Sequence, residues 1–405
     1  LMSSMVVYSA NRIPEITDTL VDLDNGMKWG YAWEFGPFEI WDNLGLKESL
    51  PEIEKAGFTI PENIKRMVEK GGTTFYRIEK GLKQYWDFAS DSYKNVPYSP
   101  SMVFLSNIKA DKSKVVLGND ACSLVDIGDD VFCFEFHTKM NALNNDVINT
   151  VPKAVEFVKK NGAGLVIGNE AGGIPPAFSA GGDLKYMLSL AKAGDFKGIN
   201  DFIADVHEGM KMIKYSPFPV VAAPFGMALG GGCEVCLWSD KIVAHNELYM
   251  ALVEVGAGLV PAGGGCYQMW RRMSESVVTP TDWLSVFLEA FQTIAMPMPS
   301  GSAQEARKKG FLRPQDRIVF NRDYLIGDAK KEVLRMSEDG YVPPACLGVK
   351  VFGQDAMGAV DANIPDMLSG YKIAPHISTV VRRVAYIISG GTAYKGTEIS
   401  EDAML

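Results

Sequence analysis

Long apolar segments are missing from this chain. No stretch reaches the roughly 18 consecutive apolar residues that a transmembrane helix requires. The first residues also lack a basic segment followed by a long apolar run, which a secretory signal peptide would show. Neither a membrane span nor membrane association is therefore expected, and the sequence predicts a cytoplasmic protein.

Basic residues are fewer than acidic residues. The 405 residues include 40 Lys and Arg against 49 Asp and Glu, which gives a net charge of −9. A nucleic-acid-binding protein usually carries a basic surface, so we expect no nucleic-acid partner. A local basic pocket for a small anion is compatible with this balance.

Histidine and cysteine are also scarce. The four histidines show no metal-ligand spacing, and we expect packing or surface roles for all of them: His137, His207, His245 and His376. The six cysteines are scattered through apolar segments, a pattern typical of free thiols in a reducing compartment: Cys122, Cys133, Cys233, Cys236, Cys266 and Cys346. Cys233 and Cys236 form a lone CxxC pair without a second pair to complete a zinc site, so no metal is expected.

The pattern along the chain changes twice. Residues 1–100 read as a helical, aromatic-rich domain, and residues 101–119 as a polar linker. From residue 120 to 405 short apolar strands alternate with helices, which indicates an α/β or α+β domain with helices at its C-terminal end. The expected elements there are a hairpin over 123–129 and 131–137, a helix over 144–162, strands over 163–170 and 218–225, a helix beginning at the GGGCE segment, and a strand over 240–252.

Two glycine-rich turns carry the first sign of chemistry, at residues 180–183 and 229–232. Glycine lets the backbone come close to a ligand and adopt positive φ. Two backbone N–H groups that converge on one carbonyl oxygen form an oxyanion hole, which stabilises an enolate. The second turn leads directly into an expected helix, whose positive N-terminal end favours negative charge.

Two glutamates accompany these turns. Glu234 lies in the first turn of the expected helix, where the helix dipole should keep it ionised. Glu254 follows twenty positions later among apolar neighbours, which should raise its pKa and favour the protonated form. Carboxyls whose surroundings push their pKa values apart are typical of an acid/base pair. The alternative is structural, with Glu234 stabilising its helix and Glu254 forming a salt bridge.

Residues from about 120 to 400 resemble the crotonase (enoyl-CoA hydratase/isomerase) superfamily. The resemblance lies in FSAGGDLKYM, PVVAAPFGMALGGGCEVCLWSD and ALVEVGAGLVPAGGG, with the upstream MNALNND similar to the family's "NAL" segment. It implies a fold of spiralling ββα units that assembles into homotrimers or hexamers. It also implies that the oxyanion-hole N–H groups belong to Gly182 and Gly231.

The same resemblance implies an enoyl-CoA hydratase, because both glutamates of the family's hydratases are matched, by Glu234 and Glu254. Glu254 would deliver a proton to C2 of a trans-2-enoyl-CoA, and Glu234 would deprotonate the water that adds to C3. One departure is the Pro261-Ala262 pair, where hydratases usually have Pro-Gly. The pathway implied is fatty-acid β-oxidation or a related acyl-CoA pathway.

Coenzyme A would enter as part of the acyl-CoA substrate, and no tightly bound cofactor is expected. The resemblance places Ala180, Gly182 and Leu184 where the family's backbone surrounds the adenine. The several negative charges of coenzyme A need local cations. Lys139, just before the NAL segment, and Lys185, just after the Asp183 turn, are the candidates, with Lys308 and Lys309 as weaker ones.

Residues 1–100 resemble a different protein, the C-terminal helical domain of 3-hydroxyacyl-CoA dehydrogenases, as found in dehydrogenase–hydratase fusions. The resemblance lies in ANRIPEITDTLVDLDNGMKWGYAWEFGPFEIWD. No βαβ unit with GxGxxG is present, and no histidine precedes His137 to serve as the dehydrogenase base. Dehydrogenase activity is therefore not expected from this chain, and a dehydrogenase domain or subunit is a candidate partner.

Two alternatives stay open. An enoyl-CoA isomerase would need only one of the glutamates. A non-catalytic assembly fragment of a bifunctional enzyme would instead use exposed aromatic residues of the first hundred as a docking surface.

Overall fold

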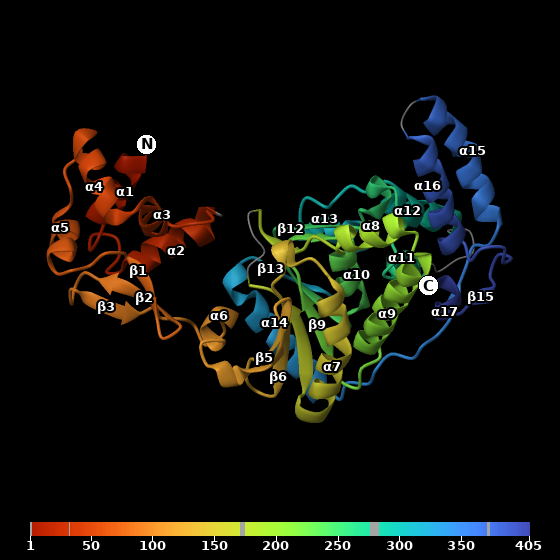
Figure 1. The fold of residues 1–405 in the computed structure, drawn as a ribbon, viewed down its shortest axis with the longest axis horizontal. Coiled ribbons are helices and arrows are strands. Elements are labelled where there is room, and N and C mark those ends of the chain that lie inside the picture. Colours follow the sequence, from red (N-terminus) through yellow and green to blue (C-terminus); the bar gives the residue numbers. More distant parts are fainter. Residues whose placement is uncertain (1, 32, 171–174, 276–282, 371–372) are drawn as a thin grey trace. The chain divides into compact units, whose positions relative to one another are not determined.

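The computed structural model describes residues 2–31, 33–170, 175–275, 283–370 and 373–405. The chain forms two compact units. The smaller unit contains residues 1–100 and 106–112, and the larger unit contains residues 101–105 and 113–405. Figure 1 shows the order of the elements along the chain by colour.

The smaller unit consists of short helices followed by an antiparallel sheet of order β1-β2-β3. Its elements are α1 (Met2–Asn11), α2 (Leu20–Tyr31), α3 (Pro37–Leu44), α4 (Leu46–Lys55), α5 (Glu62–Glu69), β1 (Tyr76–Glu79), β2 (Leu82–Asp87) and β3 (Ser92–Asn95). Phe38, Trp41 and Phe75 are fully buried at the centre of its core. The rings of Phe38 and Phe75 meet edge to face with their centroids 5.0 Å apart.

The prediction that residues 1–100 are all helical is wrong for residues 76–95. The chain reverses between β1 and β2 at Lys80 and Gly81, which both have positive φ, 50° and 79°. Two consecutive left-handed residues are what a tight two-residue hairpin turn requires. These strands carry many charged side chains and lack a clear apolar alternation, so the sequence pattern did not separate them from the preceding helices.

The larger unit is built on a seven-stranded sheet of order β13-β11-β9-β7-β6-β5-β4. Its strands are β4 (Val115–Gly118), β5 (Cys122–Asp126), β6 (Val131–Phe136), β7 (Gly164–Gly168), β9 (Val220–Ala223), β11 (Lys241–His245) and β13 (Arg317–Val319). From β13 to β6 neighbouring strands are parallel, and β5 pairs antiparallel with β6 and β4. The central strands are buried along their length, which explains their uninterrupted apolar sequences.

A second, three-stranded parallel sheet of order β12-β10-β8 holds the shorter strands. These are β8 (Ala177–Ser179), β10 (Gly226–Leu229) and β12 (Leu248–Ala251). Each follows a strand of the large sheet and precedes a helix or helical turn, so the predicted ββα repeat and the mixed α/β class are confirmed.

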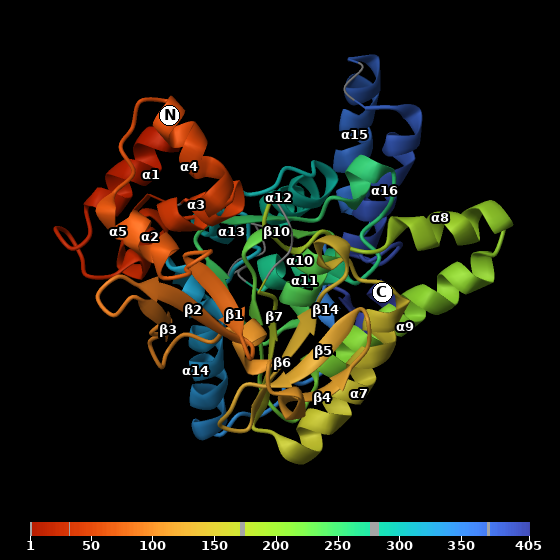
Figure 2. The ribbon, with the colours of Figure 1, turned by 60° about the vertical axis from the view of Figure 1, so that its left-hand side comes forward.

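The helices and helical turns of the larger unit complete the repeats and extend to the C-terminal end. They are η2 (Lys139–Asn141), α7 (Asn145–Asn161), α8 (Leu184–Ala193), α9 (Phe196–Lys214), α10 (Gly231–Trp238), η3 (Glu254–Ala257), α11 (Gly265–Ser274), α12 (Trp283–Ala295), α13 (Ala303–Lys308), η5 (Arg322–Tyr324), α14 (Leu325–Glu338), α15 (Asp355–Ser369), α16 (Pro375–Ile388) and α17 (Glu401–Met404). Two short elements, α6 (Leu105–Ile108) and η1 (Lys112–Lys114), each contain residues of both units. A small pair, β14 (Val349–Lys350) with β15 (Glu398–Ile399), lies among the last helices. In Figure 2, α8 and the start of α9 extend away from the sheets.

Several predicted elements of the larger unit are confirmed and two are wrong. The hairpin is β5 with β6, and the predicted helices are α7 and α10. The single strand expected over 240–252 is instead β11 and β12, which belong to different sheets. The segment 101–119, expected to be only a linker, contributes β4 to the large sheet. Both β11 and β12 are largely buried, so the apolar sequence continues across the break between them. The strand β4 lies at the edge of the sheet and pairs with one neighbour, so its sequence can be more polar than that of a central strand.

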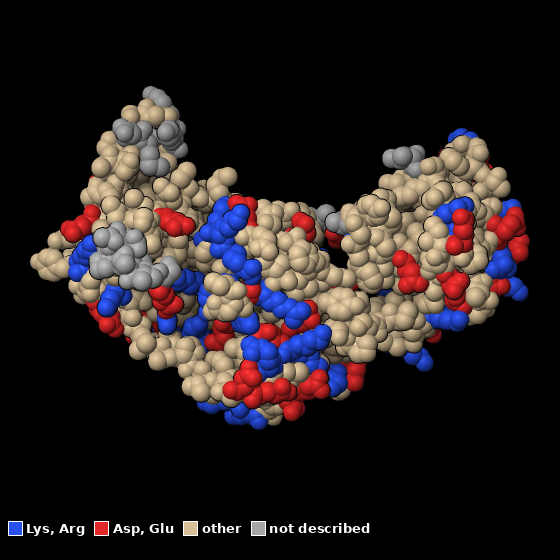
Figure 3. Space-filling model, turned by 180° about the vertical axis from the view of Figure 1, so that it is seen from behind, with Lys and Arg blue, Asp and Glu red and all other residues tan. Residues whose placement is uncertain are grey.

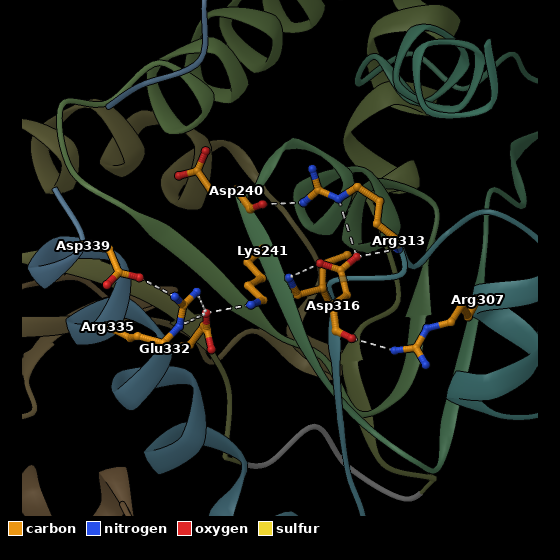
Figure 4. A network of polar contacts seen from close by, with 9 residues as sticks. Asp240, Lys241, Arg307, Arg313, Asp316, Glu332, Arg335 and Asp339 are labelled. Atoms are coloured by element: carbon orange, nitrogen blue, oxygen red, sulfur yellow. Dashed lines mark hydrogen bonds and ion pairs between the residues drawn. The ribbon is translucent and has the colours of Figure 1, made fainter. Parts of the chain in front are cut away.

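An ion-pair network fastens the C-terminal part of the large sheet (Figure 4). Asp316 is almost fully buried and accepts hydrogen bonds from the backbone of Ile242 (2.9 Å) and Arg313 (2.6 Å). Glu332 of α14 accepts from Lys241 (2.7 Å) and Arg335 (2.5 Å). These contacts connect β11 with the segments around β13 and α14, and they lie apart from the glycine turns in sequence.

Charged side chains of both signs are interspersed on the face of the molecule shown in Figure 3. Ion pairs of the larger unit include Lys330 with Asp129 at 2.8 Å and Arg317 with Asp328 at 2.8 Å. Among the helices of the described residues, none has the length and apolar character needed to cross a membrane.

Candidate active site

The first glycine turn is fixed by the segment around Leu143. The Leu143 N–H donates to the Gly181 carbonyl (2.8 Å), and the Asp183 N–H donates to the Leu143 carbonyl (3.0 Å). This parallel bridge pairs Leu143 with Gly182. In such a bridge the middle residue directs its own N–H to the opposite side. The Gly182 N–H therefore points away from the Leu143 segment.

The second glycine turn joins β10 to α10. Gly230 has φ +52°, a left-handed conformation that favours glycine. Gly231 is the first residue of α10, so its N–H has no helical carbonyl to accept it. A Cβ placed on Gly231 would lie 3.3 Å from the Gly182 nitrogen. The two turns are thus in contact, and the structure brings both predicted donors together.

Glu234 lies one turn into α10 and is 3% exposed. Its Oε1 accepts a hydrogen bond from the Gly265 N–H at 2.8 Å. Burial, with the charge of Glu254 as the second cause, raises the pKa of Glu234 to about 8, although the amides of Gly265 and Gly263 oppose the rise. The expectation that the helix dipole keeps Glu234 ionised is therefore wrong, because the loss of hydration outweighs the stabilisation at the helix N-terminus.

Glu254 begins the short helical turn η3 beside the second glycine turn. A Cβ on Gly230 would lie 2.9 Å from Glu254 Oε1, so a side chain at that position would displace the carboxyl group. The other oxygen, Oε2, is enclosed and has no hydrogen-bond partner among the described residues. Burial raises the pKa of Glu254 to about 7, as expected from its apolar neighbours. Burial therefore favours the protonated form of both glutamates.

The segment after Glu254 is shaped by close approach to Glu234. A Cβ on Gly263 would lie 2.3 Å from Glu234 Oε2, and one on Gly265 would lie 2.9 Å from Oε1. Gly264, between them, has φ +89°. Gly263 and Gly265 therefore leave room for the Glu234 carboxyl, and Gly264 adopts a backbone conformation that other residues rarely adopt. Pro261-Ala262, which stands where hydratases usually have Pro-Gly, directly precedes these glycines. The Ala262 carbonyl accepts a hydrogen bond from His207.

The residues expected to receive coenzyme A lie on the exposed side of the first turn. Lys139 and Lys185 are exposed, and the described residues show no ion pair for either. Leu184 is 55% exposed, whereas the Ala180 N–H already donates to the Met140 carbonyl at 3.1 Å.

The weaker cation candidates differ from each other. Lys309 pairs with Glu305 at 3.0 Å and donates to the Met298 carbonyl, whereas Lys308 is exposed. Within the described ranges, no three His, Cys, Asp or Glu side chains gather into a group that could hold a metal ion.

Comparison with known families identifies the region that contains these turns. A family model described as enoyl-CoA hydratase/isomerase matches residues 131–279. Residues 131–279 are thus similar to this family, and the matched region includes both glycine turns and both glutamates.

Similarity to individual proteins extends further along the chain. A Bacillus subtilis protein named probable 3-hydroxyacyl-CoA dehydrogenase is 39% identical over 406 residues, which cover 100% of this chain and 50% of the relative. A Rickettsia felis protein named putative fatty acid oxidation complex trifunctional enzyme is 31% identical, over 67% of this chain and 34% of its own length. The chain thus spans half or less of the length of these relatives.

A solved structure, the enoyl-CoA hydratase from Bacillus anthracis, matches with a TM-score of 0.43 and 20% identity, over 66% of this chain and 90% of the other.

Sequence reasoning missed three side chains around the candidate site. Trp238 Nε1 donates to the Gly263 carbonyl at 2.8 Å. His207 and His376, expected to have packing or surface roles, each bond a backbone carbonyl of the segment after Glu254. Their partners are 55 and 118 positions away in the sequence, so no local pattern could have indicated them.

Proposed function

We propose that this chain hydrates a trans-2-enoyl-CoA to a 3-hydroxyacyl-CoA, in fatty-acid β-oxidation or a related acyl-CoA pathway. The observation that carries this proposal is the placement of the buried Glu234 and the half-buried Glu254 beside two glycine turns in contact, where a Cβ on Gly231 would lie 3.3 Å from the Gly182 nitrogen. An isolated oxyanion hole would suit many reactions on a thioester. A second and a third group, the carboxyls of Glu234 and Glu254, favour the addition of water, which needs one base and one acid.

The two backbone donors would act on the thioester carbonyl. When the water oxygen bonds to C3, the C2–C3 double bond breaks and its electron pair moves toward the carbonyl oxygen, which gives an enolate. The N–H groups of Gly182 and Gly231 would donate hydrogen bonds to that oxygen. Such fixed donors stabilise the charge that develops in the transition state more than the neutral substrate, which lowers the barrier.

The two glutamates would move the protons. The reactive form would carry the proton on Glu254 and leave Glu234 ionised, against the higher pKa of Glu234 in the free site. In that form Glu234, whose Oε1 is fixed by the Gly265 N–H at 2.8 Å, would take a proton from the attacking water. Glu254 would deliver its proton to C2 as the enolate collapses. The overall reaction adds H and OH across the double bond, and the pair regains its starting state when the proton passes from Glu234 to Glu254.

Substrate binding would use the exposed side of the first turn. The exposed, unpaired Lys139 and Lys185 would attract the phosphates of coenzyme A, with the backbone at Ala180, Gly182 and Leu184 near the adenine. We propose no tightly bound cofactor. The names of the longer relatives support a dehydrogenase domain or subunit as a partner, and we propose a homotrimer or hexamer as the assembly.

A steady-state assay tests this function. The purified chain is given 2-enoyl-CoAs of short, medium and long acyl chains, with and without NAD, and the loss of the conjugated double bond is followed. We expect hydration that does not depend on NAD. Isomerisation of a 3-enoyl-CoA without hydration of any 2-enoyl-CoA would select the isomerase instead. Binding of a dehydrogenase subunit without any turnover would select the assembly fragment.

A further inference from the structure

Two histidines hold the backbone that follows Glu254. We call residues 258–265 the glycine loop. His376 of α16 donates its Nε2–H to the Gly258 carbonyl at 2.9 Å, and His207 of α9 donates to the Ala262 carbonyl at 2.5 Å. The two donors come from different helices and bond the loop near its beginning and its middle. A carbonyl can only accept, so each ring must carry its proton on Nε2.

The opposite side of the glycine loop faces the glutamates. The Gly265 N–H donates to Glu234 Oε1 at 2.8 Å, and the Gly263 amide also stabilises the Glu234 carboxylate. The Gly263 carbonyl, in turn, accepts from Trp238 Nε1 at 2.8 Å. The loop therefore directs carbonyls outward to ring N–H donors and amides inward to Glu234.

We propose that His207 and His376 are positioning residues that hold the glycine loop so that its amides stay on Glu234 and Glu254 keeps its place. Imidazole suits this task because Nε2–H is a donor in the tautomer required here and in the protonated ring alike, so the bond survives titration. The expected effect of these histidines on catalysis rests on the proposed hydratase function. Their expected effect on the position of the glycine loop is independent of that function, so catalysis and loop position are measured separately.

Hydrogen exchange of the loop amides measures the positioning directly. In His207→Phe and His376→Phe, we expect the Gly265 amide to exchange about tenfold faster than in the wild type, the size expected for losing one hydrogen bond. His207→Gln and His376→Gln keep an N–H donor at a similar distance and should restore slow exchange. Amides of β6 and β7 report whether the fold is intact.

His245→Phe is a matched control. His245 Nε2 also donates to a backbone carbonyl, that of Phe320 at 3.3 Å, but this carbonyl lies outside the glycine loop. Its substitution should leave exchange at Gly265 unchanged. His376 is exposed, so its variants avoid the risk that the protein fails to fold.

Kinetics supply the second measurement. With a 2-enoyl-CoA substrate, we expect each Phe variant to lower kcat about tenfold at an unchanged KM, and each Gln variant to recover most of it. Exchange at Gly265 that is equally slow in the wild type and in the Phe variants would overturn the proposal, as would Gln variants as impaired as the Phe variants. Wild-type protein that hydrates no substrate would overturn the hydratase function, and exchange alone would then decide the positioning.

Discussion

Both units of this protein bury carboxyl groups whose pKa values are raised, but the groups differ in what surrounds them. In the smaller unit, Asp24 has no exposed surface, and burial raises its pKa to about 7. Its oxygens accept hydrogen bonds from the N–H groups of Phe38 (2.9 Å) and Glu39 (3.2 Å) and from the Tyr76 hydroxyl (2.8 Å). These donors fix the start of α3 against β1, and Asp24 serves the fold.

In the larger unit, the pKa of Glu254 is raised to the same value of about 7, also by burial. Its Oε2, however, is enclosed without a partner in the described part of the chain. An enclosed polar atom without a hydrogen bond costs stability, which a protein tolerates where the atom has chemistry to perform. A raised pKa therefore reports burial in both units, whereas the carboxyl oxygen without a partner beside the two glycine turns distinguishes the candidate site.

Removing the proposed acid/base groups should have the largest effect and tests whether the carboxyls of the two units differ in function. Glu234→Gln and Glu254→Gln should each lower kcat for 2-enoyl-CoA hydration about 10³-fold, because an amide of the same shape cannot exchange the proton. KM should change little. The double variant should be only slightly worse than either single one, since the two groups act as a unit. Asp24→Asn is the matched control and should keep the wild-type kcat, and a loss there comparable to that of the Gln variants would contradict the distinction.

The oxyanion hole should be the next most sensitive feature. In Gly231→Ala, the new Cβ would lie 3.3 Å from the Gly182 nitrogen, in the space that a carbonyl oxygen needs between the two donors. We expect a fall in kcat of about 10²-fold. Gly358→Ala places a methyl group where nothing lies within 4 Å and controls for the extra carbon atom. Equal rates for the two variants would show that these N–H groups do not act on the substrate.

The structural carboxyl of the smaller unit should respond in stability. Asp24→Asn turns an acceptor oxygen into an N–H₂ group that faces other donors, so the free energy of unfolding should fall by about 2 kcal/mol. Asp22→Asn is the control, because Asp22 is exposed and its carboxylate accepts from the flexible hydroxyls of Thr17 and Thr19. Urea unfolding followed by tryptophan fluorescence measures both. If Asp22→Asn lowered the free energy of unfolding as much as Asp24→Asn, burial would not explain the importance of Asp24.

The stability that Asp24 contributes should also depend on pH. The pKa of Asp24 is about 7 in the folded protein and 3.8 in its unshifted state. The folded state therefore binds the proton more tightly, and the resulting stability is fully present below pH 3.8 and is lost as the pH rises through about 7. The stability difference between wild type and Asp24→Asn should accordingly be larger at pH 5 than at pH 8. A difference that grows with pH would show that the carboxylate, not the acid, is preferred in the fold.

Local patterns predicted the parts of the fold that depend on continuous stretches of sequence. The hairpin of β5 and β6 and the helices α7 and α10 follow from apolar runs and glycine or asparagine boundaries. The separation of β11 from β12 could not be predicted, because burial in two different sheets leaves the same apolar composition on both sides of the break. The sheet of the smaller unit was missed because its strands are mostly polar.

The sequence by itself determined which groups are available at the candidate site: two turns of glycine that can present backbone N–H groups, and the carboxyls of Glu234 and Glu254. Glycine is recognisable because only it combines close approach with positive φ. Only the tertiary structure decided that Glu234 is buried deeply enough to prefer its proton, against the helix dipole expected to ionise it. The tertiary structure also decided that His207 and His376 hold the glycine loop. Desolvation and contacts between distant residues depend on how the whole chain packs, and neither is encoded in any local stretch.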